Sequence, residues 1–392
     1  MAQAALTGGQ VLMPDGTFET ASVLFDGGTI TGISTAELPV DAERIDVSGC
    51  IVAPGFIDTH AHGAMGRNFM EGCKEAYSVI SRHMAGGGVT SCLATTTSAS
   101  LEDTLFALQY AASIHRNGEP GIVDILGVHL EGPYVNPAYR GAHMEEFVRQ
   151  PELSELEAIC EAAGTALRVV TLAPEVPGGM EAVRFFGGHG AKVSLGHSGA
   201  SYEETKQALA AGVCRATHLF SAMAPIHHRR PGTIPALFEQ PDVFLEMIVD
   251  GEHLHPAIVG MVARQVEAHR PVAITDSADV AGLPDGTYKR WKGMDVVVAD
   301  GRCQTLSGGL AGSIVRMDQV VDILVRQAGL PLSLALRMAS ENPARSIGAF
   351  DRKGSLETGK DADIVVLNRE LSVSLTIGKG HILYDTRANR RL

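Results

Sequence analysis

Cysteine is scarce in this sequence, and the few cysteines that it has are far apart. Among 392 residues there are six, and no two of them form a C-x-x-C pair. This spacing is neither that of a disulfide framework nor that of a zinc knuckle. We therefore expect reduced, mostly buried thiols in a cytoplasmic protein.

Long apolar runs and positive charge are lacking as well. No run approaches the roughly 20 apolar residues of a transmembrane helix, and residues 1–5 lack the basic and apolar segments of a signal peptide. The formal net charge is −13, which argues against nucleic acid or an anionic membrane as a partner. An anionic substrate would need a local cluster of basic residues.

What the sequence does have is a regular alternation of short apolar runs with helical patterns through its middle. Eight β/α units over about 250 residues are typical of a (β/α)8 TIM-like barrel. The predicted strands are 51–58, 89–95, 123–130, 168–173, 192–196, 213–217, 244–249 and 271–275. The predicted helices include 100–115, 154–163, 256–269 and 201–211, the last opened by a capping box at Ser201 and Glu204.

Both ends of the chain are rich in β-like segments. Turn signals such as Gly8-Gly9 separate short strands near the N-terminus, and strands are predicted at 29–33, 363–367 and 381–384. Neither end has enough strands for a core of its own. We therefore predict one small β-sandwich module made of residues 1–53 and 354–392, beside a barrel domain of residues 54–353.

Four polar side chains stand where predicted barrel strands end. Glu131, His197 and His218 form a set of divalent-metal ligands that leaves a position open for water. Asp276 follows the last strand and would act as the general base, because a metal lowers the pKa of its water. The alternatives are a rim glutamate, structural histidines and a helix N-cap at Asp276.

The ligand types restrict the metal without fixing it. Neutral imidazoles with a carboxylate suit Zn²⁺ or Fe²⁺, and Mn²⁺ or Co²⁺ remain open. His60 and His62 point to the same side of a strand. They would bind a second metal or fill the barrel floor, so that one or two metals per subunit are expected.

Other polar residues favour a substrate role. Arg229 lies in the densest basic cluster, residues 227–230, and is either an anion clamp or part of an exposed loop. His253 is placed to bind substrate hydroxyls or phosphate, and His143 to polarise a carbonyl. Spacing alone fixes neither histidine's role.

A series of motifs carries a family resemblance. In chain order they are HLEGPYVNPAYRGAH, LGHSGASYEE, THLFSAM followed by HHRRPG, VDGEHLH, ITDS and GGLAGS. In this order they resemble the N-acetylglucosamine-6-phosphate deacetylases of the amidohydrolase superfamily, over nearly the whole chain. The resemblance implies hydrolysis of the acetamide of N-acetylglucosamine 6-phosphate to glucosamine 6-phosphate and acetate.

The resemblance also implies residue roles. Glu131, His197 and His218 would bind the catalytic metal, Asp276 would be the acid/base, and His143 would assist at the acetyl carbonyl. The sugar phosphate would contact Ala142, Ser221, Ala222, Arg229, His253, Leu310, Ala311 and Gly312. Members are often homodimers in which a basic residue reaches the partner's phosphate, so Arg229, or its neighbours His227 and His228, would act across subunits.

Two departures keep alternatives open. Ser221 replaces the Asn of the family's Thr-His-Leu-Phe-Asn-Ala-Met motif, and segment 278–291 lacks the usual small residues. The substrate is thus alternatively N-acetylgalactosamine 6-phosphate or another small acylated amine. Opening of a cyclic amide would want a carboxylated lysine at the end of strand 168–173, where there is none. A non-catalytic binding protein is disfavoured by the intact ligand set.

Overall fold

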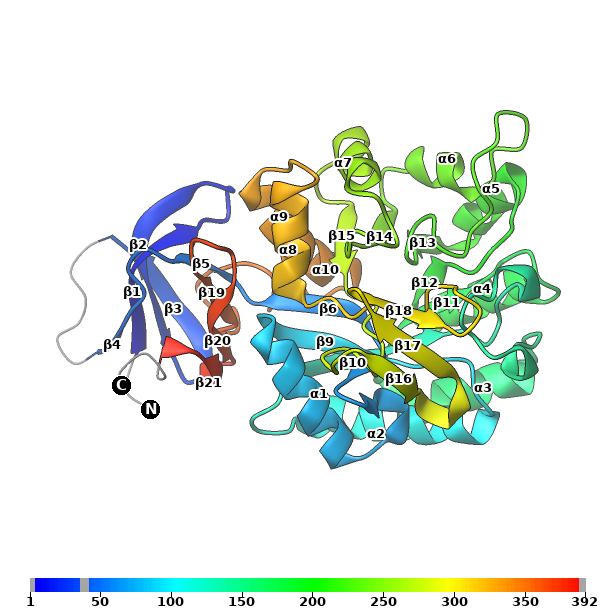
Figure 1. Cartoon of the computed structure of the whole chain (residues 1–392), viewed down its shortest axis with the longest axis horizontal. Coiled ribbons are helices and arrows are strands. Elements are labelled where there is room, and N and C mark those ends of the chain that lie inside the picture. The colour runs from blue at the N-terminus through cyan, green and yellow to red at the C-terminus, as the bar shows by residue number, and fades with distance from the viewer. Residues whose placement is uncertain (1–3, 36–41, 388–392) are drawn as a thin grey trace.

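The computed structural model describes residues 4–35 and 42–387. A small β-module and a larger α/β barrel lie side by side along the long axis of the molecule (Figure 1). The first and last described strands, β1 Ala4–Leu12 and β21 His381–Asp385, both belong to the small module (Figure 1). In the described part of the chain, no helix is long and apolar enough to cross a membrane.

The barrel is a sheet of eight parallel strands in the order β15-β14-β13-β12-β11-β10-β9-β6. Their bounds are β6 Phe56–Ala61, β9 Val89–Thr95, β10 Asp124–Glu131, β11 Leu167–Leu172, β12 Lys192–Leu195, β13 Val213–Ala216, β14 Phe244–Ile248 and β15 Pro271–Ile274. Beyond β15, the amide of Asp276 donates to the carbonyl of His60 at 2.9 Å and brings the first and last strands together. The predicted (β/α)8 architecture is confirmed.

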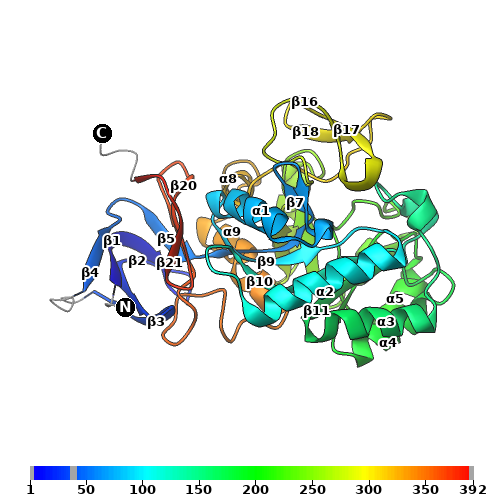
Figure 2. The same ribbon diagram turned by 90° about the horizontal axis from the view of Figure 1, so that it is seen from below.

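Helices cover the outside of the barrel (Figures 1 and 2). They are α1 Lys74–Gly86, α2 Leu101–Asn117, α3 Leu153–Ala163, α4 Gly179–Gly188, α5 Tyr202–Ala211, α6 Thr233–Phe238, α7 Pro256–Gln265, α8 Met317–Arg326, α9 Leu332–Ala339 and α10 Glu341–Ser346. Short 3-10 turns are η1 Phe69–Glu71, η2 Pro137–Tyr139, η3 Glu145–Phe147, η4 Gly164–Ala166 and η5 Trp291–Gly293. The capping box predicted at Ser201 and Glu204 is formed.

The small module is a second eight-stranded sheet, in the order β21-β20-β19-β5-β1-β2-β3 with β4 paired to β1. Its strands are β1 Ala4–Leu12, β2 Phe18–Asp26, β3 Thr29–Ser34, β4 Glu43–Asp46, β5 Ile51–Pro54, β19 Ile364–Leu367, β20 Val373–Gly378 and β21 His381–Asp385. Strands from the two chain ends face one another around a separate apolar core (Figure 2). This is the small sandwich that the sequence predicts.

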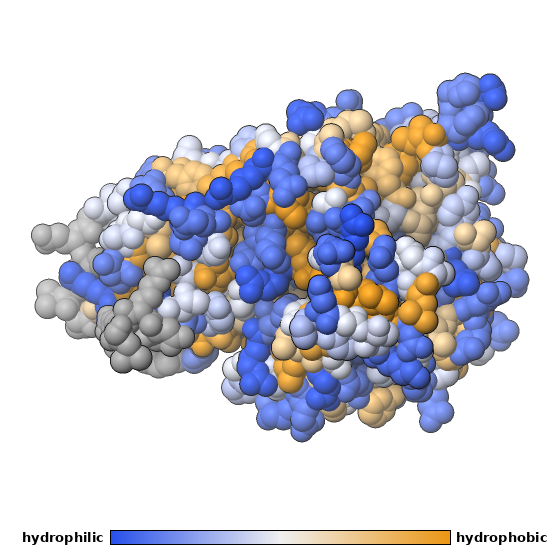
Figure 3. All heavy atoms as spheres, viewed as in Figure 1, coloured by the Kyte–Doolittle hydropathy of each residue, from blue (hydrophilic) through white to orange (hydrophobic). Residues whose placement is uncertain are grey.

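A three-stranded sheet, β16–β18, is inserted after the last barrel strand. It consists of β16 Gly286–Lys289, β17 Asp295–Ala299 and β18 Arg302–Thr305, and it stands apart from the barrel strands on one side of the molecule (Figure 2). A short hairpin of β7 Gly63–Ala64 and β8 Arg67–Asn68 follows β6. Arg290, just after β16, lines the cavity at the mouth of the barrel. Hydrophilic and hydrophobic residues are interspersed over this face of the molecule (Figure 3).

Three details of the predicted elements are wrong. Segment 51–58 is not one strand, because the chain leaves the small module at Pro54 and enters the barrel at Phe56. Gly55 makes this crossing, where a Cβ would lie 2.3 Å from the Thr90 side chain. Gly8-Gly9 lies inside β1 at a shift of register, so it is a bulge and not a turn. The helix predicted to His269 ends at Gln265, because Val266 is extended.

Candidate active site

The carboxyl ends of the barrel strands surround a cavity of about 300 Å³. This is the end at which barrel enzymes place their catalytic groups. Its lining residues are His62, Thr97, Glu131, Gly141, Ala142, His143, His197, His218, Ser221, Ala222, Ile248, His253, Asp276, Arg290, Leu310 and Gly312. The structure therefore brings together residues that are up to 250 positions apart in the chain.

The backbone is strained where three of the predicted site residues follow their strands. His197, His218 and Asp276 have φ of 49°, 30° and 49°, a left-handed conformation that residues other than glycine rarely adopt. Such outliers persist where the surrounding structure holds them, and they cluster at functional sites. Here the sharp turn at each strand end directs the side chain toward the barrel axis.

The side chains of Glu131, His197 and His218 converge. Glu131 Oε1 lies 3.3 Å from His197 Nε2 and 3.1 Å from His218 Nε2, and the two Nε2 atoms are 3.0 Å apart. The Nδ1 atoms of the histidines lie 2.9 and 3.1 Å from the backbone carbonyls of Tyr139 and Ser221. Because a carbonyl only accepts, each Nδ1 carries the proton, and each Nε2 presents a lone pair.

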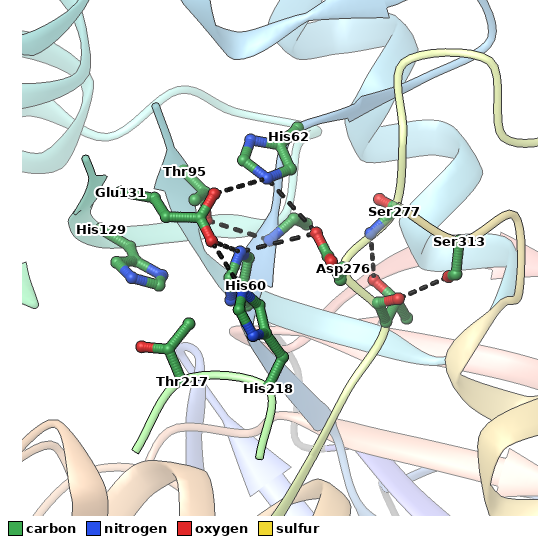
Figure 4. Close-up of polar contacts among 12 residues, drawn as sticks. His60, His62, Thr95, His129, Glu131, Thr217, His218, Asp276, Ser277 and Ser313 are labelled. Atoms are coloured by element: carbon green, nitrogen blue, oxygen red, sulfur yellow. Dashed lines mark hydrogen bonds and ion pairs between the residues drawn. The ribbon is translucent and has the colours of Figure 1, made fainter. Parts of the chain in front are cut away.

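A second group of donors adjoins the first one (Figure 4). His62 Nε2 lies 3.2 Å from Glu131 Oε2 and 3.3 Å from Asp276 Oδ1, and His60 Nε2 lies 3.2 Å from Glu131 Oε1 and 3.5 Å from Asp276 Oδ1. Glu131 thus stands between the two groups, with one carboxylate oxygen toward each His of the second pair. His60 is fully buried beneath the cavity.

The converging nitrogen and oxygen atoms can all bind a divalent metal, whereas they cannot all form hydrogen bonds with one another. Three acceptors, two imidazole lone pairs and a carboxylate oxygen, meet at Glu131, His197 and His218 with no hydrogen to share among them. His60 Nε2 and His62 Nδ1 are buried atoms without a hydrogen-bond partner. Clusters of this composition bind transition metals.

The surrounding charges hold both carboxylates ionised. Burial would raise the pKa of Glu131, but His60 and the neighbouring His197 and His218 outweigh burial and hold that pKa well below its usual range. The pKa of Asp276 is likewise lowered, against the effect of burial, chiefly by His60 and His62. Two negative charges therefore face the cluster of imidazoles.

His143 differs from the other histidines of the site. Its Nδ1 accepts a hydrogen bond from the amide of Ser98 at 3.2 Å, so the proton is on Nε2. Burial and the neighbouring His197 lower its pKa to about 3, which keeps the ring neutral. Its Nε2–H is therefore a donor at the cavity wall, 3.6 Å from Glu131 Oε2.

Most of the residues predicted to hold the substrate line the cavity. These are Ala142, His143, Ser221, Ala222, His253, Leu310 and Gly312. His253 is fixed by Asp250, whose carboxylate lies 2.7 Å from its Nδ1. Ala311 is buried and does not line the cavity, although its neighbours do.

Arg229 does not reach the cavity of its own chain. It is exposed, and its guanidinium lies against the neighbouring His228 at 2.8 Å. Neither histidine of this loop, His227 or His228, is among the lining residues. In this structure the loop is therefore separate from the cavity lining of its own chain.

Arg290 is a site residue that the sequence did not reveal. It comes from the insertion that carries the β16–β18 sheet, and its guanidinium donates to Asp279 at 2.8 Å and to the Ala311 carbonyl at 3.1 Å. Among the described residues that line the cavity, it alone carries a permanent positive charge. The one available signal was the unusual composition of segment 278–291. Thr97 also lines the cavity, but it follows β9 and carried no signal at all.

The fold and the site together define a metal-dependent hydrolase on a (β/α)8 barrel. The model of the amidohydrolase family matches residues 51–383, and the chain belongs to this family. It is therefore a hydrolytic enzyme, and the cluster of potential metal ligands at the barrel mouth agrees with its family.

Full-length relatives sharpen the comparison. The chain is 37% identical to the N-acetylglucosamine-6-phosphate deacetylase of Vibrio furnissii, over 93% of this chain and 91% of that protein. It is 36% identical to the N-acetylgalactosamine-6-phosphate deacetylase of Escherichia coli O157:H7, over 93% and 95%. The solved N-acetyl-D-glucosamine-6-phosphate deacetylase of Mycobacterium smegmatis, in complex with N-acetyl-D-glucosamine 6-phosphate, superimposes with a TM-score of 0.91 at 33% identity, covering 98% of this chain and all of that chain (100%). The family resemblance predicted from the motifs is confirmed.

Proposed function

We propose that the protein hydrolyses the acetamide of N-acetylglucosamine 6-phosphate to glucosamine 6-phosphate and acetate. The observation that carries this proposal is the convergence of Glu131, His197 and His218 beside Asp276, on a cavity walled by the neutral donor His143. The names of the relatives support the choice of substrate class. The product set follows from cleavage of the C–N bond of the amide.

Glu131, His197 and His218 would hold the catalytic metal, and His60 and His62, with Asp276 beside them, would hold a second one. Zn²⁺ fits this set of imidazoles and carboxylates best, with Fe²⁺, Mn²⁺ and Co²⁺ as alternatives. When bound, such a metal polarises a carbonyl and makes water a stronger nucleophile at neutral pH.

The chain's own groups perform the proton transfers. Asp276 takes a proton from the attacking water as the water oxygen bonds to the acetyl carbon. It then delivers this proton to the nitrogen as the C–N bond of the amide breaks. The Nε2–H of His143 donates to the carbonyl oxygen, on which negative charge develops. Because the Ser98 amide occupies Nδ1, His143 is held in the tautomer that donates on the cavity side.

The substrate-binding residues would divide between the sugar and its phosphate. Ala142, Ser221, Ala222, His253 and residues 310–312 stand around the cavity or directly behind its wall. Arg229 would reach the phosphate from the other subunit of a homodimer, since it lies outside its own cavity. The wide spacing of the six cysteines agrees with a reducing compartment, and we place the enzyme in the cytoplasm.

We also propose that the barrel domain binds the substrate and that the small module has a supporting role. All lining residues of the cavity fall between positions 62 and 312, inside the proposed barrel domain of residues 54–353. Residues 1–53 and 354–392 would form the small module that supports the barrel without touching substrate.

A second candidate substrate is N-acetylgalactosamine 6-phosphate. Ser221 stands on the cavity wall, where the family motif has Asn, and its backbone carbonyl also fixes His218. The relative from Escherichia coli O157:H7 acts on the galacto sugar by its name. The mechanism would be unchanged, because the two sugars carry the same acetamide.

The deciding experiment is acetate release by the purified, metal-analysed protein. The substrates are N-acetylglucosamine 6-phosphate, its galacto epimer and unphosphorylated N-acetylglucosamine. We expect the gluco phosphate to be turned over with the highest kcat/KM. Preference for the galacto epimer would indicate that Ser221 and its surroundings determine the sugar specificity. Release of no acetate from any of these substrates by the metal-loaded protein would refute the substrate class.

A further inference from the structure

An ion pair, Glu246 with Arg215, lies inside the barrel directly beneath the cavity. Glu246 is in β14, Arg215 is in β13, and both side chains are 0% exposed. The interior of such a barrel is normally filled by branched apolar side chains. Burying two charges is costly unless their contacts are good, so this pair calls for an explanation.

The contacts of the pair lead to one residue of the metal cluster. Arg215 Nη2 contacts Glu246 Oε1 closely and lies 3.3 Å from Thr59 Oγ1. Thr59 donates to the same Oε1 at 3.2 Å. The other oxygen, Oε2, faces His60 Nδ1 at 3.4 Å. One oxygen of Glu246 is thus held by Arg215 and Thr59, and the other is left for His60.

This arrangement fixes the orientation and the tautomer of His60. Glu246 is paired with the guanidinium of Arg215, so its carboxylate is ionised and only accepts hydrogen bonds. His60 Nδ1 must then carry the hydrogen that points at Glu246, which leaves Nε2 as the ring atom that can offer a lone pair to a metal. That Nε2 atom has no hydrogen-bond partner and lies between Glu131 and Asp276.

An alternative is that Glu246 binds a metal directly, together with His129 and His60. A ligand atom of His129 lies within 4.8 Å of those of His60 and Glu246. Both of its ring nitrogens are already engaged. Nδ1 lies 3.1 Å from the Thr59 carbonyl, and Nε2 lies 2.7 Å from Thr171 Oγ1. His129 packs edge-on against His60 at 4.5 Å between ring centroids, so it supports the ring and offers no free ligand atom.

We propose that Glu246 and Arg215 are positioning residues which hold His60 as a ligand of the second metal. Glu246 accepts the Nδ1 hydrogen, and Arg215 keeps Glu246 in place and charged. The inference rests on the proposed function, in which His60 is a metal ligand. Outer partners of this kind are worth about 10- to 100-fold in metal affinity.

The test compares two double variants that differ in one acceptor. Arg215→Met with Glu246→Gln removes both charges but keeps a carbonyl oxygen for His60. Arg215→Met with Glu246→Met removes the charges and the acceptor, at nearly the same size. Neutral replacement of a buried ion pair is often tolerated. Zn²⁺ per chain is measured by elemental analysis after equilibration with a graded series of chelator concentrations.

We expect the wild type to bind two Zn²⁺ per chain. The Gln variant should retain both, and the Met variant should lose the second about 10- to 100-fold more readily while it keeps the first. A control variant, Arg149→Met with Glu155→Gln, removes an ion pair of 2.8 Å that touches no proposed ligand. It should leave both metals in place.

Two results would overturn the proposal. One is a wild type that binds a single Zn²⁺, and the other is equal metal affinity in the Gln and Met variants, which would make the pair a filler of the barrel. Metal content is independent of the substrate. If no sugar phosphate is turned over, the proposed function fails while this measurement still decides the role of Glu246.

Discussion

The histidines of the site show that one residue type serves opposite roles, according to its backbone partner. His197 and His218 have a carbonyl at Nδ1, so their Nε2 atoms are lone-pair donors to a cation. His143 has an amide N–H at Nδ1, so its Nε2 is a hydrogen-bond donor. The chemical role of each ring is therefore set by the loop that lies behind it.

Asp276 provides the sharpest prediction for a single residue. Asp276→Asn removes the proton acceptor but keeps the size of the side chain, so kcat should fall by about 10²- to 10⁴-fold. The metal at Glu131, His197 and His218 should stay bound. Acetate release and metal content, measured on the same sample, test both statements. A kcat near that of the wild type would remove Asp276 from the mechanism.

Among the elements, the insertion with β16–β18 brings a fixed positive charge to the cavity. It delivers Arg290 to the cavity and holds its guanidinium through Asp279, whose second oxygen accepts from the Trp291 amide at 2.8 Å. The Asp279 pair and the nearby Asp276 raise the pKa of Arg290, although burial opposes this. The charge is therefore permanent and fixed in direction.

Arg290→Met should raise KM for the phosphorylated sugar by about 10- to 100-fold, because a charge-assisted hydrogen bond is worth about 1.5–3 kcal/mol. The fall in kcat should be smaller, since the contact is present before and during the reaction. Initial rates over a range of substrate concentrations separate the two constants. Lys292→Met, in the same insertion but outside the cavity lining, is the control. Equal kinetics of both variants would exclude Arg290 from substrate binding.

At the scale of the whole molecule, a buried lysine joins the barrel to the small module. Lys353 is 0% exposed, and its Nζ lies 2.9 Å from Asp124 at the start of β10. It also lies 2.9 Å from Asp361 and 2.6 Å from Asp363, just before β19. The pKa of Lys353 is raised by these carboxylates despite its burial. The two parts of the molecule are thus held together by charge as well as by apolar contact.

Lys353→Met should lower the free energy of unfolding by about 3–5 kcal/mol at neutral pH, because it removes the buried cation that Asp124, Asp361 and Asp363 share. Burial opposes a low pKa at Asp124, but Lys353 and Lys379 lower it. The stability from Asp124 is therefore present above about pH 4 and is lost as the pH falls through its lowered, folded-state pKa. Denaturant unfolding at pH 7 and pH 3 should show a difference between the two proteins that shrinks in acid. A constant difference would contradict this linkage.

Substitution of Arg229 tests whether one chain contributes to the substrate site of another. Arg229→Ala should raise KM for the phosphorylated sugar far more than it lowers kcat. If Arg229 acts across subunits, a mixed dimer of one Arg229→Ala chain and one inactive Asp276→Asn chain contains one site with both wild-type residues. Activity should then appear in the mixture beyond the sum of its parts. An unchanged KM in Arg229→Ala would refute the clamp.

The sequence by itself determined the barrel, the small module made from both ends, and the positions of Glu131, His197, His218 and Asp276. These follow from local periodicity and from the rule that barrel strands end at one rim. The sequence did not show that segment 51–58 is divided between two sheets, because the chain passes from one sheet to the other through the single residue Gly55.

Only the tertiary structure decided which atoms of these residues face one another. Glu246 and His60 are 186 positions apart, and neither has a local pattern that pairs them. The insertion brings Arg290 to the cavity in the same way, through folding that no neighbouring residue encodes. The tautomers of the histidines depend on carbonyls and amides from distant loops. Local pattern thus determines the elements and where they end, whereas long-range packing determines the chemistry of the site.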